Sequence, residues 1–168
     1  MNLKKNLIAF FVIGAVGSLS HFVYEWTNKN YIIGLFFPVN ESTWEHLKLL
    51  FFPGLVYFLI AYFMKKEKPK NYFPALAISL IWGMTLIVTL FYSISGVLGF
   101  NSDFINIIIY FISVAATLCK RNKILASGKY SSNNALVISL FYLTVMTLLL
   151  MLFSYNPPNL GIFENPIP

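Results

Sequence analysis

The chain has 168 residues, of which 58% are hydrophobic and only 11% are charged, whereas a typical soluble domain has roughly 25% charged residues. Its mean hydropathy is +0.71. So few polar residues cannot cover the surface of a soluble globule, which excludes a soluble enzyme or nucleic-acid-binding protein, and so many apolar residues exclude a disordered chain. The single cysteine, Cys119, excludes an intrachain disulfide and a cysteine-based zinc site. The composition indicates an integral membrane protein.

Five segments have the length and apolar character of membrane-spanning helices, which need about 17–25 residues. They are residues 6–24, 43–64, 72–98, 103–119 and 134–153. Their connections are short, so we expect one all-α membrane domain over residues 1–168. Lys4, Lys5 and the run Ala15-Val16-Gly17 also resemble a cleaved signal peptide, but the apolar run continues to Tyr24, which favours an uncleaved span.

Two further segments are expected to lie outside the spans. Residues 31–37 are apolar but too short to cross a bilayer, which predicts an interfacial or re-entrant segment between the first two spans. The tail, residues 154–168, contains four prolines and cannot form a long helix. Its apolar residues Leu160, Ile162 and Phe163 favour docking as a lid, with polar contacts from Glu164 or Asn165; a frayed terminus is the alternative.

Positively charged residues gather on alternate connections. Ten of the twelve precede the first span or lie between spans two and three or four and five: Lys4, Lys5, Lys65, Lys66, Lys68, Lys70, Lys120, Arg121, Lys123 and Lys129. Because Lys and Arg collect in short cytoplasmic loops, the N-terminus is predicted to lie inside and the C-terminus outside. Basic residues that set the topology and attract anionic lipid of the bilayer account for the isoelectric point near 9.4. The charge therefore does not require a nucleic-acid partner.

The first span carries Gly14, Ser18, His21 and Glu25 at offsets of 0, 4, 7 and 11, which places them on one helical face. The small residues allow close helix approach, within the chain or to another membrane protein. Ionisable groups inside a span cost at least about 2.5–3.5 kcal/mol at mid-helix, so His21 and Glu25 are candidates for a polar site near the outer surface. A structural His–Glu pair at the interface is the alternative.

The most informative segment is Pro38-Val39-Asn40-Glu41-Ser42-Thr43-Trp44-Glu45-His46-Leu47-Lys48. Ser42 and Glu45 have capping-box spacing, which predicts that the Ser42 side chain accepts from the Glu45 N–H while Glu45 reaches back to the Ser42 backbone. Glu41, Glu45 and Lys48 would share one helical face, with an ion pair between Glu45 and Lys48. His46 needs a partner from another element.

Polar residues also mark the start of the fourth span. Asn101, Ser102 and Asp103 are all good N-cap residues, so at least one of them is expected to cap this helix. Asn106 lies one turn further in and faces the interior of the bundle in this interpretation.

These placements bring both histidines and four of the six acidic residues to the outer leaflet. The predicted polar site comprises His21, Glu25, Asn40, Glu41, Ser42, Glu45, His46, Lys48, Asp103 and Asn106. Candidate ligands of a metal ion such as zinc are His21, Glu25, Glu45 and His46, since imidazole with carboxylate is a reasonable zinc set. A hydrogen-bonded plug and a metal-free ligand pocket explain the same residues.

The runs Gly34-Leu35-Phe36, Pro38-Val39-Asn40-Glu41-Ser42, Trp44-Glu45-His46-x-Lys48-Leu49 and Phe52-Pro53 resemble the signature of a family of small multi-pass bacterial membrane proteins without an assigned activity. The resemblance covers about residues 21–53. It implies a five-span protein of the bacterial cytoplasmic membrane. It also implies an acidic residue directly before Pro166, where this chain has Asn165.

Three hypotheses for function follow. The leading one is a membrane protein that binds a small molecule or a lipid at the outward-facing His/Glu site. The second is an intramembrane metal-dependent hydrolase, although the chain lacks the His-Glu-x-x-His signature of zinc proteases. The third is a structural subunit, an oligomer or a scaffold of a membrane complex.

Overall fold

The computed structural model describes residues 3–166, which form six α-helices and one short 3₁₀ helix, with no strand in this range. Five of the α-helices are long and apolar enough to cross a membrane. They are α1 (Leu3–Trp26), α3 (Thr43–Phe63), α4 (Tyr72–Leu98), α5 (Asp103–Ser127) and α6 (Asn133–Leu152). The predicted all-α fold is confirmed, with five helices that are long and apolar enough to cross a membrane.

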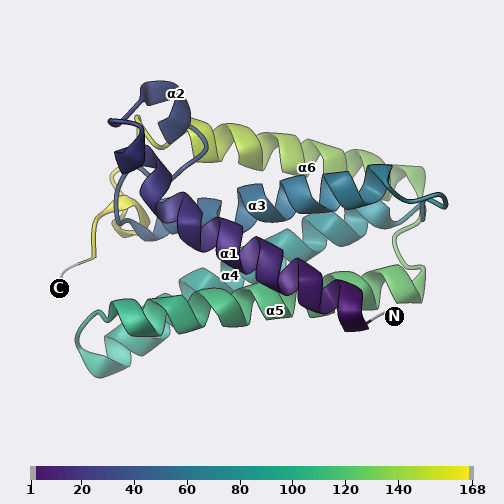
Figure 1. The fold of residues 1–168 in the computed structure, drawn as a ribbon, viewed down its shortest axis with the longest axis horizontal. Coiled ribbons are helices and arrows are strands. Elements are labelled where there is room, and N and C mark those ends of the chain that lie inside the picture. The colour runs from purple at the N-terminus through teal and green to yellow at the C-terminus, as the bar shows by residue number, and fades with distance from the viewer. Residues whose placement is uncertain (1–2, 167–168) are drawn as a thin grey trace.

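The five long helices run alternately up and down along the long axis of the molecule (Figure 1). The most extensive contact joins α4 to α5, while α1 packs against α3 and α5, and α6 lies mainly against α4. The start of α1 and the α3–α4 and α5–α6 connections therefore share one end of the bundle. The α2 region, the α4–α5 turn and the tail up to residue 166 share the other, which we call the C-terminal end (Figure 1).

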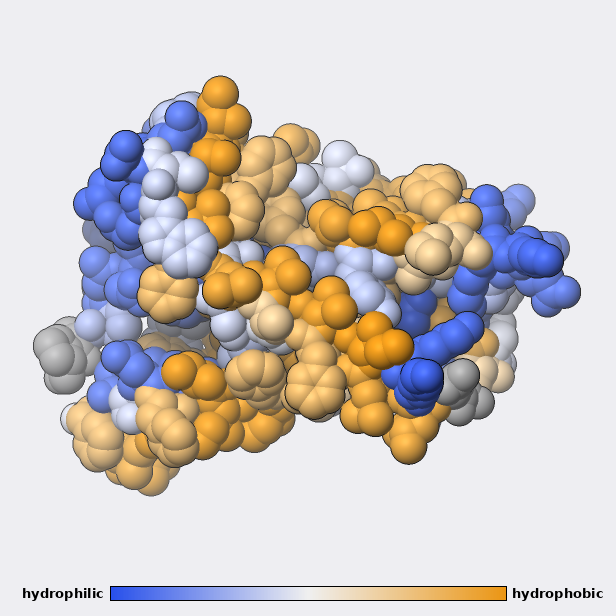
Figure 2. Space-filling view, in the orientation of Figure 1, coloured by the Kyte–Doolittle hydropathy of each residue, from blue (hydrophilic) through white to orange (hydrophobic). Residues whose placement is uncertain are grey.

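Apolar side chains cover the outside of the bundle. Phe11, Phe104 and Phe141 are 64%, 72% and 70% exposed. On the face shown in Figure 2, apolar residues occupy the middle, while hydrophilic residues gather at the two ends. Monomeric soluble proteins rarely expose such an extended apolar surface, whereas a surface in contact with lipid is apolar.

A proline in α3 explains one contact at the centre of the bundle. Pro53 has no N–H, so the Leu49 carbonyl lacks its usual partner within the helix. The Tyr110 hydroxyl lies 3.2 Å from this carbonyl and donates to the Ile13 carbonyl at 2.9 Å. A Cβ at Gly17 would collide with that hydroxyl, so glycine is needed there. One tyrosine thus joins α5 to both α1 and α3.

The small residues of α1 serve contacts inside the chain. A Cβ added to Gly14 would lie 2.6 Å from the Phe111 ring of α5, and Gly17 faces Tyr110. The predicted close helix approach is therefore found between α1 and α5. Association with another membrane protein remains a prediction.

Helix α5 continues beyond residue 119, the predicted end of the fourth span. It ends at Ser127, where Gly128 adopts a left-handed φ of 64° as the C-cap. The extension contains Arg121, whose guanidinium lies 4.3 Å from the Phe58 ring centre and 4.9 Å from that of Tyr72. Cation–π contacts of this kind bind the C-terminal part of α5 to α3 and to the N-terminal end of α4.

The short segments gather at the C-terminal end. Helix α2 (Tyr31–Gly34) is capped by the Asn30 side chain, and its Tyr31 is 61% exposed, as expected for an interfacial segment. The 3₁₀ helix η1 (Gly161–Phe163) contacts α3, and its Phe163 ring centre lies 4.9 Å from that of Trp44. The tail is thus docked against the bundle through residue 166.

Tyr155 fastens the tail to α2. Its ring stacks on Tyr31 at 4.3 Å, and its hydroxyl donates to the Tyr31 carbonyl at 3.0 Å. Burial, with a contribution from neighbouring tyrosines, raises the pKa of Tyr155 to about 12. The hydroxyl therefore keeps its proton at neutral pH and remains a hydrogen-bond donor.

Candidate functional site

A cavity of about 580 Å³ lies at the C-terminal end, between α1, α3, α4 and α5. The molecule is hollowed at this end, between the α2 region and the α4–α5 turn (Figure 2). Polar side chains that line it are Ser18, His21, Glu41, Thr43, His46, Asn101, Asp103 and Asn106, together with Tyr110. Apolar ones are Phe22, Leu49, Ile87, Phe91, Ile107 and Ile109. Its volume is within the range of small-molecule sites, roughly 300–1,000 Å³.

Two histidines and one glutamate converge at the polar part of this cavity. The Nε2 atom of His21 lies 3.2 Å from the Oε2 atom of Glu41, and the Nε2 atom of His46 lies 3.5 Å from the same oxygen. The two imidazole rings are 5.3 Å apart, centre to centre. Glu41 is 62% exposed, whereas both imidazoles are less than one-third exposed. The predicted meeting of His21 with His46 is therefore present.

Local hydrogen bonds orient the members of this cluster. The Nδ1 atom of His46 lies 2.9 Å from the Ser42 carbonyl, which can only accept, so Nδ1 carries a proton and Nε2 faces Glu41. The Glu41 backbone N–H donates to the Oδ1 atom of Asn165 in the tail at 3.1 Å. One member is thus oriented by α3 itself and another by the C-terminal segment.

Asn40 and Ser42 act as capping residues next to the cluster. The Ser42 side chain accepts from the Glu45 N–H, as predicted, and is the N-cap of α3. The Ser42 N–H, however, donates to the Asn40 side chain at 2.9 Å instead of to Glu45. The expected reciprocal half of the capping box is therefore wrong, because Glu45 is engaged elsewhere.

Glu45 and Lys48 form a buried ion pair at 2.8 Å, with side chains 1% and 0% exposed. Lys48 also donates to the Gly34 carbonyl at 2.8 Å and to the Ser154 hydroxyl at 2.5 Å, and Glu45 accepts from the Val39 N–H at 3.0 Å. The predicted i,i+3 pair is confirmed. It joins α2, α3 and the segment after α6, and neither Glu45 nor Lys48 lines the cavity.

The acidic residues of the predicted site do not all lie beside the histidines. Glu25 pairs with Lys29 at 3.3 Å on the surface, and Glu45 pairs with Lys48 in the interior. Glu41 takes the place beside the histidines that the sequence assigned to these two. The physical reason is that α3 begins at Thr43, so Glu41 precedes the helix and does not share a helical face with Glu45.

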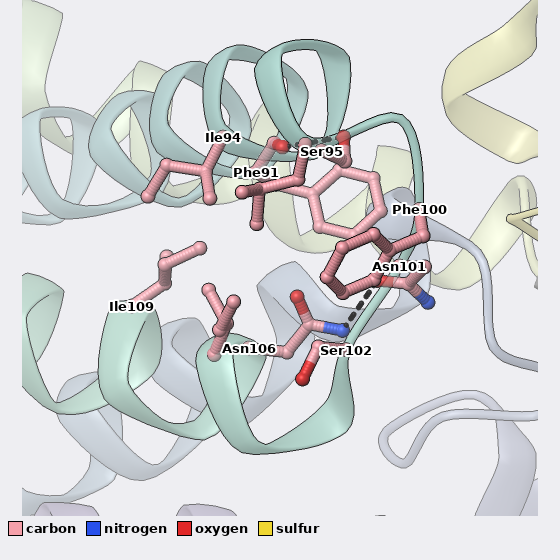
Figure 3. Close-up of a pocket in the computed structure, with 10 residues that line it drawn as sticks. Phe91, Ile94, Ser95, Phe100, Asn101, Ser102, Asn106 and Ile109 are labelled. Carbon is pink, nitrogen blue, oxygen red and sulfur yellow. Dashed lines mark hydrogen bonds between the residues drawn. The ribbon is translucent and has the colours of Figure 1, made fainter.

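Asp103 and Asn106 line the same cavity from α5. Ser102 is the N-cap residue of α5, as the sequence allows, but its side chain makes no capping hydrogen bond. The Asn106 amide donates to the Asn101 side chain at 2.9 Å across the α4–α5 turn (Figure 3). Asn106 thus stabilises the turn and also faces the cavity.

Periodicity and spacing in the sequence do not indicate the contacts of two residues of this region. Ser154 directly follows the last span, and nothing in its neighbourhood indicates a bond to Lys48. Pro166 lines the cavity although it follows Tyr110, the nearest other lining residue in the sequence, by 56 residues. Only the path of the folded tail brings either residue into place.

Fold and site together define a multi-pass helical membrane protein with a polar-ended cavity at one end of the bundle. Within that class, the chain belongs to a family of unknown function, DUF6512, whose model matches residues 2–168. No curated protein and no solved structure matches the chain. The family membership extends over nearly the whole chain and assigns no activity.

Proposed function

We propose that the cavity binds an amphiphilic small molecule or a lipid. The polar group of the ligand would lie at His21, Glu41 and His46, and its apolar part along Leu49 and Ile109. The observation that carries this proposal is the order of the lining residues on α3 and α5. At the start of these helices the lining is polar (Thr43, His46, Asp103 and Asn106), and further along it becomes apolar (Leu49, Ile107 and Ile109). A ligand that is polar throughout would leave the apolar wall without a partner.

The position of Phe22 and Ile107 supports an amphiphile in particular. Both side chains line the cavity and are 52% and 55% exposed. They come from α1 and α5, so an opening between these two helices would join the cavity to the apolar outer surface of the bundle. A ligand with an acyl or other apolar chain can enter from the bilayer while its polar group approaches the histidines.

We infer the direction of the opening from the charge distribution. The end that carries ten of the twelve basic residues would face the cytoplasm of a bacterial cell, with the N-terminus inside. The cavity at the opposite end would open at the outer face of the cytoplasmic membrane. The ligand would then come from the outer leaflet or from outside the cell.

Ile107→Trp tests the binding proposal, with Ile108→Trp as a matched control. Ile107 lines the cavity, whereas its neighbour Ile108 is 43% exposed and is not among the lining residues. We expect mass spectrometry of purified protein to detect an amphiphile enriched over the surrounding membrane, lost in Ile107→Trp and retained in Ile108→Trp. Equal ligand content in both variants, or no enrichment in the wild type, would reject the proposal.

A metal-dependent hydrolase is the second candidate, favoured by the two imidazoles and the carboxylate that face this cavity. Two histidines and a glutamate are also the zinc ligands of some hydrolases, and Asp103 offers a further carboxylate for acid–base catalysis. Zinc-supplemented protein assayed with ester, amide and phosphodiester amphiphiles distinguishes the two functions. Turnover that Asp103→Asn abolishes favours the hydrolase, and absence of turnover on all three classes rejects it.

A further inference from the structure

The donor atoms beside the cavity have the composition of a transition-metal site. One ligand atom from each of His21, Glu41 and His46 lies within 4.8 Å of the other two. Two imidazole nitrogens and one carboxylate oxygen suit zinc and its neighbours, whereas magnesium and calcium prefer oxygen ligands alone. The donor set therefore selects the class of ion before any distance is considered.

The distances fit a tetrahedral ion. Zinc bonds of about 2.0–2.1 Å to nitrogen and oxygen place neighbouring ligand atoms about 3.4 Å apart. The two separations between Glu41 and the imidazoles are 3.2 and 3.5 Å. Two edges of the coordination polyhedron thus have the required length, and the third joins two imidazole nitrogens that lie within 4.8 Å of each other and would approach further when an ion binds.

The hydrogen bonds around the cluster are those of a metal-binding histidine. A histidine ligand usually donates its second ring N–H to a carbonyl or carboxylate, which directs the other nitrogen at the ion. His46 does so through Nδ1 and the Ser42 carbonyl. Asn165 holds the backbone of Glu41 in a comparable supporting role.

A purely structural plug explains these contacts less well. Glu41 is 62% exposed, so its carboxylate can remain hydrated and does not need two imidazoles to satisfy it. The neighbouring acids Glu25 and Glu45 have lysine partners of their own, and only Glu41 faces both histidines. The convergence of two imidazole nitrogens on a single oxygen is the arrangement that an ion between them would stabilise.

We propose that His21, Glu41 and His46 bind zinc or a similar divalent transition metal, with the remaining coordination position open to the cavity. This site goes beyond amphiphile binding, which depends on the cavity and not on the ion. Zinc binding without turnover would reject the hydrolase alone. Absence of zinc binding would reject the metal site and leave the Ile107→Trp test of amphiphile binding unaffected.

The test uses full-length protein in lipid nanodiscs, stripped with a chelator and titrated with zinc against a chromophoric competitor. We expect one zinc per chain, and binding weakened at least about 100-fold in Glu41→Gln, since even supporting residues of metal sites contribute roughly 10–100-fold. Asn165→Ala is expected to weaken zinc binding by roughly 10–100-fold, as for a supporting residue. Glu25→Gln, which changes an exposed acid at the same end, is the matched control and should bind like the wild type.

Cobalt(II) provides a readout that a structural role would not change. In the wild type it should produce the intense visible absorption of a tetrahedral site, and Glu41→Gln should abolish it. Because Glu41 is exposed, this variant is expected to fold, which size-exclusion chromatography verifies. Absence of stoichiometric zinc binding by the wild type, or equal affinity of Glu41→Gln and Glu25→Gln, would overturn the proposal.

Discussion

At the scale of single residues, the buried Lys48–Glu45 pair has the largest consequences for stability. The Ser154 hydroxyl donates to the Leu150 carbonyl, so its oxygen accepts from Lys48. With the Gly34 carbonyl and Glu45, Lys48 has three acceptors within 2.8 Å, as many as an ammonium has protons, and the Phe37 carbonyl lies at 3.3 Å. Removal of Lys48 would leave a carboxylate in the interior with a single backbone donor.

Lys48→Met is therefore expected to destabilise the protein by about 3–5 kcal/mol, the cost of leaving one charge of a buried pair without its partner. In detergent this corresponds to a fall in the unfolding midpoint on the order of 10 °C. The double variant Lys48→Met/Glu45→Gln should recover part of the loss, because it leaves no buried charge.

Lys29→Met is the control for that prediction. It breaks the Lys29–Glu25 pair, whose side chains are 63% and 65% exposed, and such surface pairs contribute about 0–1 kcal/mol. Thermal unfolding of the three variants side by side provides the comparison. A Lys48→Met midpoint no lower than that of Lys29→Met would contradict a stabilising role of the buried pair.

At the scale of elements, the tail after α6 makes contacts with α2, α3 and α4 and so links them at the C-terminal end. Ser154 bonds to Lys48 of α3 and Tyr155 to Tyr31 of α2. Further along, the Tyr92 hydroxyl of α4 donates to the Gly161 carbonyl at 3.2 Å. The tail continues to the Glu41 backbone, beside the histidines. It forms part of the cavity wall, and its docking should affect access to the site.

Phe163→Ala is expected to loosen this tail without unfolding the helices. The Phe163 ring contacts Trp44 and Phe153, and the loss of two aromatic contacts should raise amide hydrogen exchange over residues 159–165 roughly 10-fold. Leu160→Ala, at a residue 60% exposed in the same segment, should leave exchange unchanged. Equal exchange in the two variants would show that the aromatic contacts do not hold the tail.

At the scale of the whole molecule, length and apolar character were sufficient to predict the helices, because each span must cross the bilayer by itself. The local pair of Glu45 and Lys48 was also predictable, since both lie within one helix. The position of Glu41 was not, because helical offsets do not apply before Thr43. Contacts between Asn165 and Glu41 depend on the path of the tail, which periodicity does not describe.

The proposal that the cavity opens outward depends on the orientation of the protein in the membrane. Cysteine labelling tests this orientation. In a Cys119→Ser background, a cysteine replaces Lys66 or Lys129 at the basic end, or Asn159 in the tail; all three positions are exposed. Because basic loops stay in the cytoplasm, a membrane-impermeant maleimide should label Asn159→Cys in intact cells and the lysine replacements only after permeabilisation. Labelling of Lys66→Cys and Asn159→Cys from the same side would contradict the five-span topology, and labelling of Lys66→Cys alone in intact cells would invert it.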